Sequence, residues 1–329
     1  MSPNWPAGQV PRLASGETLL QAARIRIGTR GSPLALAQAH EVRDRLAKAH
    51  GLPEDAIAIT IIKTTGDRVT DRPLSDIGGK GLFTKEIEDA LFAREIDVAV
   101  HSMKDMQTAL PDGLAIGAVL PREDPRDAFI SLKHANIDAL PQGAVVGTSS
   151  LRRKSQVLSV RPDLKVIDFR GNVETRLKKL KDGIAEATFL AVAGLNRLGL
   201  ADRITAIVPA EDMLPAAAQG AIGLEIRAGD QEAAALVAPL NDARTALAVT
   251  AERAFLARLE GSCRTPIAGH AVIEGDQLSF RGQVLSVDGK QRYDVSRTGP
   301  SDAAREIGLA AADEILSKAD PAILAHSSA

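Results

Sequence analysis

The stretch HSMKD (residues 101–105) brings a hydroxyl, an ammonium group and a carboxylate together within four residues. It continues the apolar run VAV (98–100), which is typical of a strand, and ligands of open α/β sheets bind outside the carboxyl ends of strands. Asp105 is therefore a candidate acid or base, or a stabiliser of a cationic intermediate. Lys104 is a rival candidate as a Schiff-base nucleophile, and a solvated loop with an incidental Lys104–Asp105 pair is the plain alternative.

A second candidate is Cys263, the single cysteine among 329 residues. A lone cysteine is usually a small buried hydrophobic residue. This one lies in EGSCRTP, where Gly261, Ser262 and Pro266 favour a turn at the surface. Arg264 beside the sulfur favours the nucleophilic thiolate. We therefore expect an accessible sulfur atom to which another group is attached.

Arginines gather where predicted strands lead into predicted helices, in TRGS (29–32), TSSLRRK (148–154) and FRGNVETR (169–176). Free N–H groups at a helix start attract anions, and guanidinium groups fit carboxylates bidentately. Residues 150–182 hold ten basic and four acidic side chains, within a chain of net charge −2. A solvated helix face explains the lysines of this segment but not its arginines. The pattern predicts a cleft for several carboxylates or phosphates.

Composition excludes several classes of function. Aromatic residues make up only 3% of the chain, which disfavours base stacking on single-stranded nucleic acid, and the charge gives no sign of nucleic acid or anionic membrane as a partner. No apolar run approaches the roughly 18 residues that span a bilayer. One cysteine fits a reducing compartment, so we expect a cytoplasmic protein. Residues 1–23 resemble neither a signal nor a transit peptide, and we expect a disordered extension there.

The chain also lacks common cofactor motifs. No G-x-G-x-x-G follows the first predicted strand, and GGKG (78–81) has neither the spacing nor the Ser/Thr of a P-loop. The six histidines show no H-x-x-x-H spacing, so we expect no protein-ligated metal. The glycine-rich segment remains a candidate lid.

Alternating strands and helices predict parallel α/β layers. Apolar patterns indicate strands at 23–28, 56–64, 98–102, 114–120, 144–150, 164–169 and 221–228, and helices at 33–50, 81–97, 151–160 and 172–183. The segment 187–194 is predicted to be a strand followed by a turn. A break near 121–125 indicates a crossing between two lobes. After 241 the pattern changes to a helix, three strands joined by turns, and a final helix at 301–319. This predicts a small α+β domain with antiparallel hairpins.

The motifs IRIGTRGSPLALAQA, DVAVHSMKD, VGTSSLRR, FRGNVETRL and AERAFLARLEGSCRTPIA, taken in order, resemble the hydroxymethylbilane synthase (porphobilinogen deaminase) family from about residue 24 to the C-terminus. The resemblance implies two periplasmic-binding-protein-like α/β lobes and a small α+β C-terminal domain with a three-stranded antiparallel sheet. The expected domains are 24–120 with 221–238, then 121–220, then 241–329, after the extension 1–23.

The same resemblance implies a transferase that condenses four porphobilinogen molecules head to tail. The reaction releases ammonia and gives linear hydroxymethylbilane for tetrapyrrole biosynthesis. The growing oligopyrrole is carried on a dipyrromethane cofactor, which is attached to Cys263 through a thioether. A monomer without nucleic-acid or membrane partners is expected. A non-catalytic two-lobed anion-binding protein is the runner-up, and a lyase using Lys104 is a third reading.

Residue by residue, the resemblance makes Asp105 catalytic. It implies that the cofactor is held by Cys263, Ser102, Lys104, Asp105, Thr148, Ser150, Arg152, Arg153 and Arg170. It implies that substrate or the growing chain is held by Arg30, Ser32, Arg170, Asn172, Arg176 and Gln219, with Arg197 as a further contact and Lys80 and Phe83 on a lid. The chain departs from the family pattern at Gln107, where proline is frequent, and at Asp76, where some members carry lysine.

Overall fold

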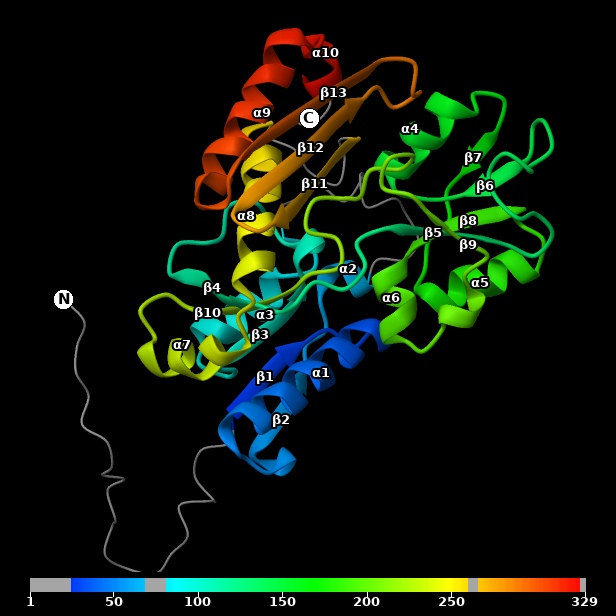
Figure 1. The fold of residues 1–329 in the computed structure, drawn as a ribbon. Coiled ribbons are helices and arrows are strands. Elements are labelled where there is room, and N and C mark those ends of the chain that lie inside the picture. The colour runs from blue at the N-terminus through cyan, green and yellow to red at the C-terminus, as the bar shows by residue number, and fades with distance from the viewer. Residues whose placement is uncertain (1–24, 69–80, 260–265, 326–329) are drawn as a thin grey trace, which may run out of the picture.

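The computed structural model describes residues 25–68, 81–259 and 266–325, which form two α/β lobes and a third domain (Figure 1). The sheet of the first lobe has the strand order β2-β1-β3-β10-β4. In it β1 runs parallel to β2 and β3, whereas β10 runs antiparallel to β3 and β4. The strands are β1 (Ile25–Thr29), β2 (Ile57–Ile61), β3 (Val98–Ser102), β4 (Leu114–Val119) and β10 (Ile222–Arg227).

The sheet of the second lobe has the order β7-β6-β8-β5-β9. Here β6 runs parallel to β7 and β8, and β5 runs antiparallel to β8 and β9. The strands are β5 (Asp127–Ser131), β6 (Val145–Gly147), β7 (Lys165–Ile167), β8 (Ala187–Ala191) and β9 (Ala206–Val208).

The two sheets therefore share one plan: three parallel strands, one antiparallel strand and an edge strand parallel to the first three. The antiparallel strand lies next to the chain crossings between the lobes. β5 is the first strand of the second lobe after the first crossing. β10 follows the second crossing, which returns the chain to the first lobe, and lies between β3 and β4. Gly220 in the second crossing has φ +90, and a Cβ there would lie 2.3 Å from the carbonyl oxygen of Glu123. The crossings thus pack backbone against backbone.

Helices cover both sheets, and their first turns are capped by side chains. Ser32, Ser150, Asn172 and Asp242 accept hydrogen bonds from the backbone N–H three residues on, which satisfies donors that lack partners at a helix start. The lobe helices are α1 (Pro33–His50), α2 (Thr65–Arg68), α3 (Lys85–Phe92), α4 (Leu151–Val160), α5 (Val173–Lys181), α6 (Val192–Arg197) and α7 (Gln231–Val237).

The third domain is the antiparallel sheet β11-β12-β13 covered on one face by two long helices (Figure 1). Phe255 and Phe280 meet in its core with ring centroids 5.0 Å apart. Its elements are α8 (Ala243–Arg258), β11 (Ile267–Glu274), β12 (Gln277–Leu285), β13 (Arg292–Pro300), α9 (Ala304–Lys318) and α10 (Pro321–Ala325). The predicted fold class, two α/β lobes with an α+β domain, is confirmed.

Two predicted elements differ from the structure. The helix predicted at 81–97 is the shorter α3, because Gly81 and Arg94 adopt positive φ angles of 81° and 57° that end it on both sides. The turn predicted after Ala191 is the helix α6. Its VAG sequence is too short for a helical period to be recognised.

Candidate active site

Asp105 ends a single 3₁₀ turn, η4 (Met103–Asp105), that follows β3 directly. The turn lies tightly on β10, because a Cβ at Gly223 would come within 2.0 Å of the Met103 sulfur. Met103 is buried while Asp105 is exposed. This geometry presents the carboxylate at the strand end, as the sequence predicts, over a rigid base.

A small pocket of about 60 Å³ lies beside Asp105 in the first lobe. Arg30 and Phe83 form one wall, with the guanidinium carbon 4.1 Å from the ring centroid, a cation–π distance. Ser102 and Gln38 form another, with Ser102 Oγ 2.8 Å from Gln38 Nε2. The pocket also includes Ser32. It thus joins a cation, a carboxylate and hydroxyls around one small space.

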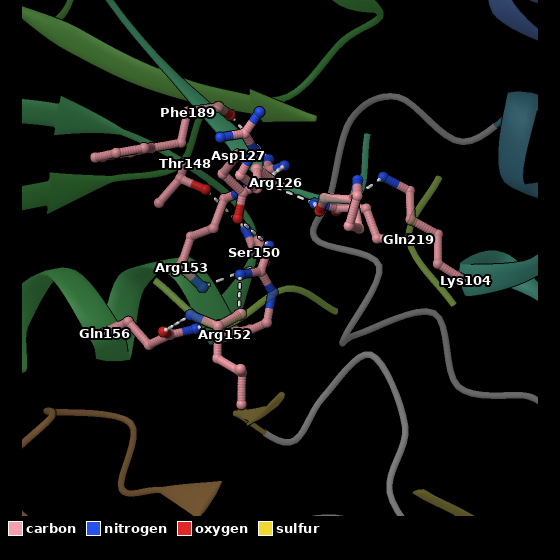
Figure 2. Close-up of polar contacts among 12 residues, drawn as sticks. Lys104, Arg126, Asp127, Thr148, Ser150, Arg152, Arg153, Gln156, Phe189 and Gln219 are labelled. Carbon is pink, nitrogen blue, oxygen red and sulfur yellow. Dashed lines mark hydrogen bonds and ion pairs between the residues drawn. The ribbon is translucent and has the colours of Figure 1, made fainter. Parts of the chain in front are cut away.

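In the second lobe, Arg152 and Arg153 converge on one carboxylate, Asp127 (Figure 2). Arg152 Nη2 lies 2.7 Å from Asp127 Oδ2, and Arg153 Nη2 lies 2.7 Å from Asp127 Oδ1. Each arginine also donates to a backbone oxygen, that of Leu214 or of Phe189. Burial favours protonation of Asp127, but the charges of both arginines outweigh it and hold the pKa of Asp127 far below its usual range.

This pairing differs from the expectation for Arg152 and Arg153 that was based on the sequence. Arg152 and Arg153 were expected to grip acid groups of a cofactor, yet their side chains are only 5% and 7% exposed and are already paired with a protein carboxylate. Two guanidinium groups against one carboxylate still leave one net positive charge. Arg152 Nε is moreover buried without a hydrogen-bond partner among the described residues.

Lys104 connects the two lobes through Gln219 (Figure 2). Its Nζ lies 3.4 Å from Gln219 Oε1, and Gln219 Nε2 donates to Asp127 Oδ1 at 3.0 Å and to the oxygen of Pro125 at 2.7 Å. Burial lowers the pKa of Lys104 to about 8, with the charge of Asp105 opposing the shift and that of Arg153 adding to it. Lys104 is thus a cation that would gain from an anionic ligand.

Arg170 precedes α5, and Arg176 lies in the first turns of that helix. Arg176 Nε donates to the oxygen of Gly171 at 2.9 Å. Burial, followed by the charges of Arg153 and Arg170, lowers the pKa of Arg176 to about 10, and the charge of Asp105 opposes this shift. Arg176 therefore lies within the electric field of cations in its own lobe and of the carboxylate in the other. Arg170 Nη1 is buried and has no hydrogen-bond partner in the described part of the chain.

The hydroxyl and amide candidates of the second lobe act locally as caps. Thr148 Oγ1 accepts from the N–H of Ser150 at 3.2 Å, and Ser150 Oγ accepts from that of Arg153 at 3.4 Å. Asn172 Oδ1 accepts from the N–H of Thr175 at 2.8 Å, which leaves its amide nitrogen for another partner. Arg197 instead joins the lobes, 3.2 Å from Glu41 Oε2 and 3.0 Å from the oxygen of Gly220.

Cys263 and Lys80 lie outside the described residues, between the ends of α8 and β11 and before α3 respectively. Sequence reasoning missed Asp127, Gln38 and Arg253. Asp127 stands in REDPRDAF at the start of β5, and a carboxylate before an apolar run was the signal available in the sequence.

Within the described ranges, no group of three His, Cys, Asp or Glu side chains could hold a metal ion, and no helix there is long and apolar enough to cross a membrane.

Comparison with known proteins gives consistent matches. The family model described as porphobilinogen deaminase, dipyromethane cofactor binding domain, matches residues 25–235, and the model of the porphobilinogen deaminase C-terminal domain matches residues 246–317. The porphobilinogen deaminase of Paracoccus denitrificans is 61% identical over 295 residues, covering 90% of this chain and 94% of the relative. That of Nitrobacter hamburgensis is 56% identical over 306 residues, covering 93% and 96%.

Among solved structures, the periplasmic VFT2 domain of BvgS from Bordetella pertussis aligns with a TM-score of 0.38 at 15% identity, covering 65% of this chain and 84% of that one. A periplasmic substrate-binding protein of an ABC transporter from Coxiella burnetii aligns with a TM-score of 0.39 at 13% identity, covering 68% and 94%.

Proposed function

The chain belongs to the porphobilinogen deaminase family, and from that premise we propose that it condenses four porphobilinogen molecules into linear hydroxymethylbilane with release of ammonia. The observation that supports this most directly is the exposed carboxylate of Asp105, which lies between two sets of cations. Arg30 lies in its pocket, and Arg176 of the opposite lobe lies within its electric field. A carboxylate so placed suits a substrate that carries acid groups and becomes cationic during reaction.

The cofactor that the family carries, dipyrromethane on a cysteine thioether, fits the residues of the cleft. Two buried guanidinium nitrogens, Arg152 Nε and Arg170 Nη1, lack an acceptor among the described residues, and buried donors without partners are costly. Acid groups would supply such acceptors. We propose that Ser102, Lys104, Thr148, Ser150 and the three arginines at 152, 153 and 170 face the cofactor, and that Cys263 anchors it. When bound, dipyrromethane supplies the pyrrole carbon to which the first substrate is joined.

The chain's own groups account for the rest of each addition. The aminomethyl group of the substrate reacts as its ammonium ion: the C–N bond breaks, ammonia leaves with the bonding electron pair, and a cation remains that Asp105 stabilises by charge and by accepting pyrrole N–H hydrogen bonds. A C–C bond then forms to the waiting pyrrole carbon, and Asp105 accepts the proton which that carbon loses. Arg30, Ser32, Asn172, Arg176 and Gln219 are proposed to hold the acid side chains of substrate and product.

The assembly and location follow the same proposal. We infer a monomer that acts in the cytoplasm. A single cysteine that must stay free to carry a cofactor supports a reducing compartment. Size-exclusion chromatography with light scattering at several protein concentrations tests the monomer, since a dimer would double the measured mass.

The test of function is stoichiometric. Purified protein incubated with porphobilinogen should release ammonia and linear tetrapyrrole in a ratio of four to one. Bound but unchanged porphobilinogen would contradict the proposal and favour the anion-binding alternative. The lowered pKa of Lys104 also suits an imine-forming amine, so borohydride reduction during turnover is included. An adduct trapped on Lys104 would support the lyase reading instead.

A further inference from the structure

We propose that Arg253 is a positioning residue that holds the Asp105 loop in place from the third domain. The inference rests on the proposed function and deepens it, because it assigns a role in turnover to a residue that lies outside the pocket. Arg253 belongs to α8, the helix that joins the third domain to the first lobe (Figure 1).

The contacts of Arg253 fall on three successive carbonyl groups. Its Nη1 lies 3.5 Å from the oxygen of Met106, and its Nη2 lies 2.5 Å from that of Gln107 and 3.2 Å from that of Thr108. These residues follow Asp105 immediately in the chain. A guanidinium group is planar and presents its donors in a fixed fork, so its two terminal nitrogens hold several carbonyls in a geometry that a single ammonium nitrogen does not reproduce.

The same face of α8 also packs on the other end of the turn. Val249, one helical turn before Arg253, belongs to one buried cluster with Met103 and Met106. Met103 begins the turn that ends at Asp105, and Met106 follows it. The third domain therefore contacts the Asp105 turn through apolar side chains and holds the backbone beyond it through Arg253.

Arg253 is a half-buried cation with a buried counter-charge. Burial lowers its pKa, and the carboxylate of Glu225 on β10 opposes that shift. Glu225 itself pairs with His101, whose Nε2 lies 3.0 Å from Glu225 Oε2 on the strand that leads to the turn. The guanidinium thus lies within the electric field of a buried carboxylate on β10, one of the strands that support Asp105.

This arrangement links the carboxylate to the helix that precedes the cofactor cysteine. Cys263 follows Arg253 by ten residues, and α8 extends through Arg258. A contact between α8 and the Asp105 loop therefore sets where the carboxylate lies relative to the third domain. Losing it should displace Asp105 during every addition, while the cations that bind substrate stay in place.

The experiment compares Arg253→Met with Arg258→Met in the primer-carrying full chain. Arg258 lies on the same helix but is exposed and is paired with Asp313 inside the third domain, at 2.6 Å. Turnover is expressed per primer-carrying molecule, counted by intact mass. We expect Arg253→Met to lower kcat about 10–100-fold, the range caused by small misplacements of catalytic groups. KM should stay within threefold, and the enzyme-bound intermediates should keep their wild-type proportions.

A purely structural role predicts something different: a lower unfolding temperature with unchanged kcat per primer-carrying molecule. That result, or a kcat within twofold of Arg258→Met, would overturn the proposal. If Arg253→Met does not fold, Arg253→Lys undergoes the same comparison, because its single nitrogen lacks the planar two-nitrogen fork and kcat should still fall. The proposed function fails separately, if wild-type holoenzyme forms no tetrapyrrole.

Discussion

At the scale of single residues, the strand-end position of Asp105 was visible in the sequence, but the partners of the arginines were not. Asp127 lies 25 and 26 residues from Arg152 and Arg153, and no local spacing links positions so far apart. The pairing depends on β5 lying beside β8. Residue types therefore predicted a basic cleft, while the structure shows which cations are already neutralised in part by the protein.

Replacing Asp105 with asparagine tests the central carboxylate. The side chain is exposed, so Asp105→Asn should leave the unfolding temperature unchanged. Turnover should fall by roughly 10²–10⁴-fold, the usual contribution of a general acid or base. The assay is tetrapyrrole formation per primer-carrying molecule. Asp112→Asn, an exposed change seven residues on, is the control, and equal rates in both variants would remove Asp105 from the mechanism.

Lys104 gives a prediction about pH. Without primer, burial holds its pKa at about 8 instead of 10.5. Competitive acylation with acetic anhydride, read by peptide mass spectrometry, should therefore be half-maximal near pH 8 in primer-free Cys263→Ser protein. Acid groups of the primer favour the ammonium form, so the midpoint should rise in the wild-type holoenzyme. Exposed Lys133 serves as the internal standard.

The lowered pKa of Lys104 also sets the direction in which folding stability changes with pH. The unfolded chain binds more protons than the folded primer-free protein between pH 8 and 10.5, so folding stability should increase as the pH rises through that window. Identical acylation midpoints with and without primer would contradict the contact between Lys104 and the cofactor.

At the scale of elements, alternating patterns predicted most strands and helices, but they did not predict which strands pair within each sheet or in which direction. β5 and β10 each run antiparallel in a sheet whose first three strands are parallel. Periodicity shows that a strand exists, whereas its neighbours depend on long-range packing. The structure shows N-caps at Ser32 and Asn172, directly before α1 and α5.

The start of α5 carries the prediction for elongation. Arg176 is half-buried and is oriented by its bond to Gly171, which has φ +119. Arg176→Leu should keep the first addition and slow later ones, because the lengthening chain brings more acid groups to this helix end. Quenched reactions analysed by intact mass should then show partly extended species. Lys178→Leu, an exposed change on the same helix, is the control, and matching species distributions would contradict the role of Arg176.

At the scale of the whole molecule, the third domain contacts both segments in which the chain crosses between the lobes. Glu252 on α8 is fully buried and accepts from Arg122 Nη1 at 2.6 Å in the first crossing and from the N–H of Ala218 at 2.5 Å in the second. It also accepts from the N–H of Ala271 at 2.7 Å on β11. The sequence showed none of these three contacts, because the partners of Glu252 come from three separate parts of the chain.

Glu252→Ala should therefore destabilise the molecule as a whole. Removing one partner of a buried ion pair leaves an uncompensated charge and costs about 3–5 kcal/mol. Urea unfolding at neutral pH measures this change. Asp313→Ala breaks the exposed pair with Arg258 and should have little effect. Equal midpoints for the two variants would show that the crossings do not depend on Glu252.

The proposal as a whole depends on a sulfur that carries an oligopyrrole into this cleft. The most direct measurement is the intact mass of the purified chain. The account predicts a mass above that of the sequence by one dipyrromethane, lost in Cys263→Ser, and further increments of one pyrrole unit after brief exposure to porphobilinogen. An unmodified chain that forms tetrapyrrole at full rate would contradict it.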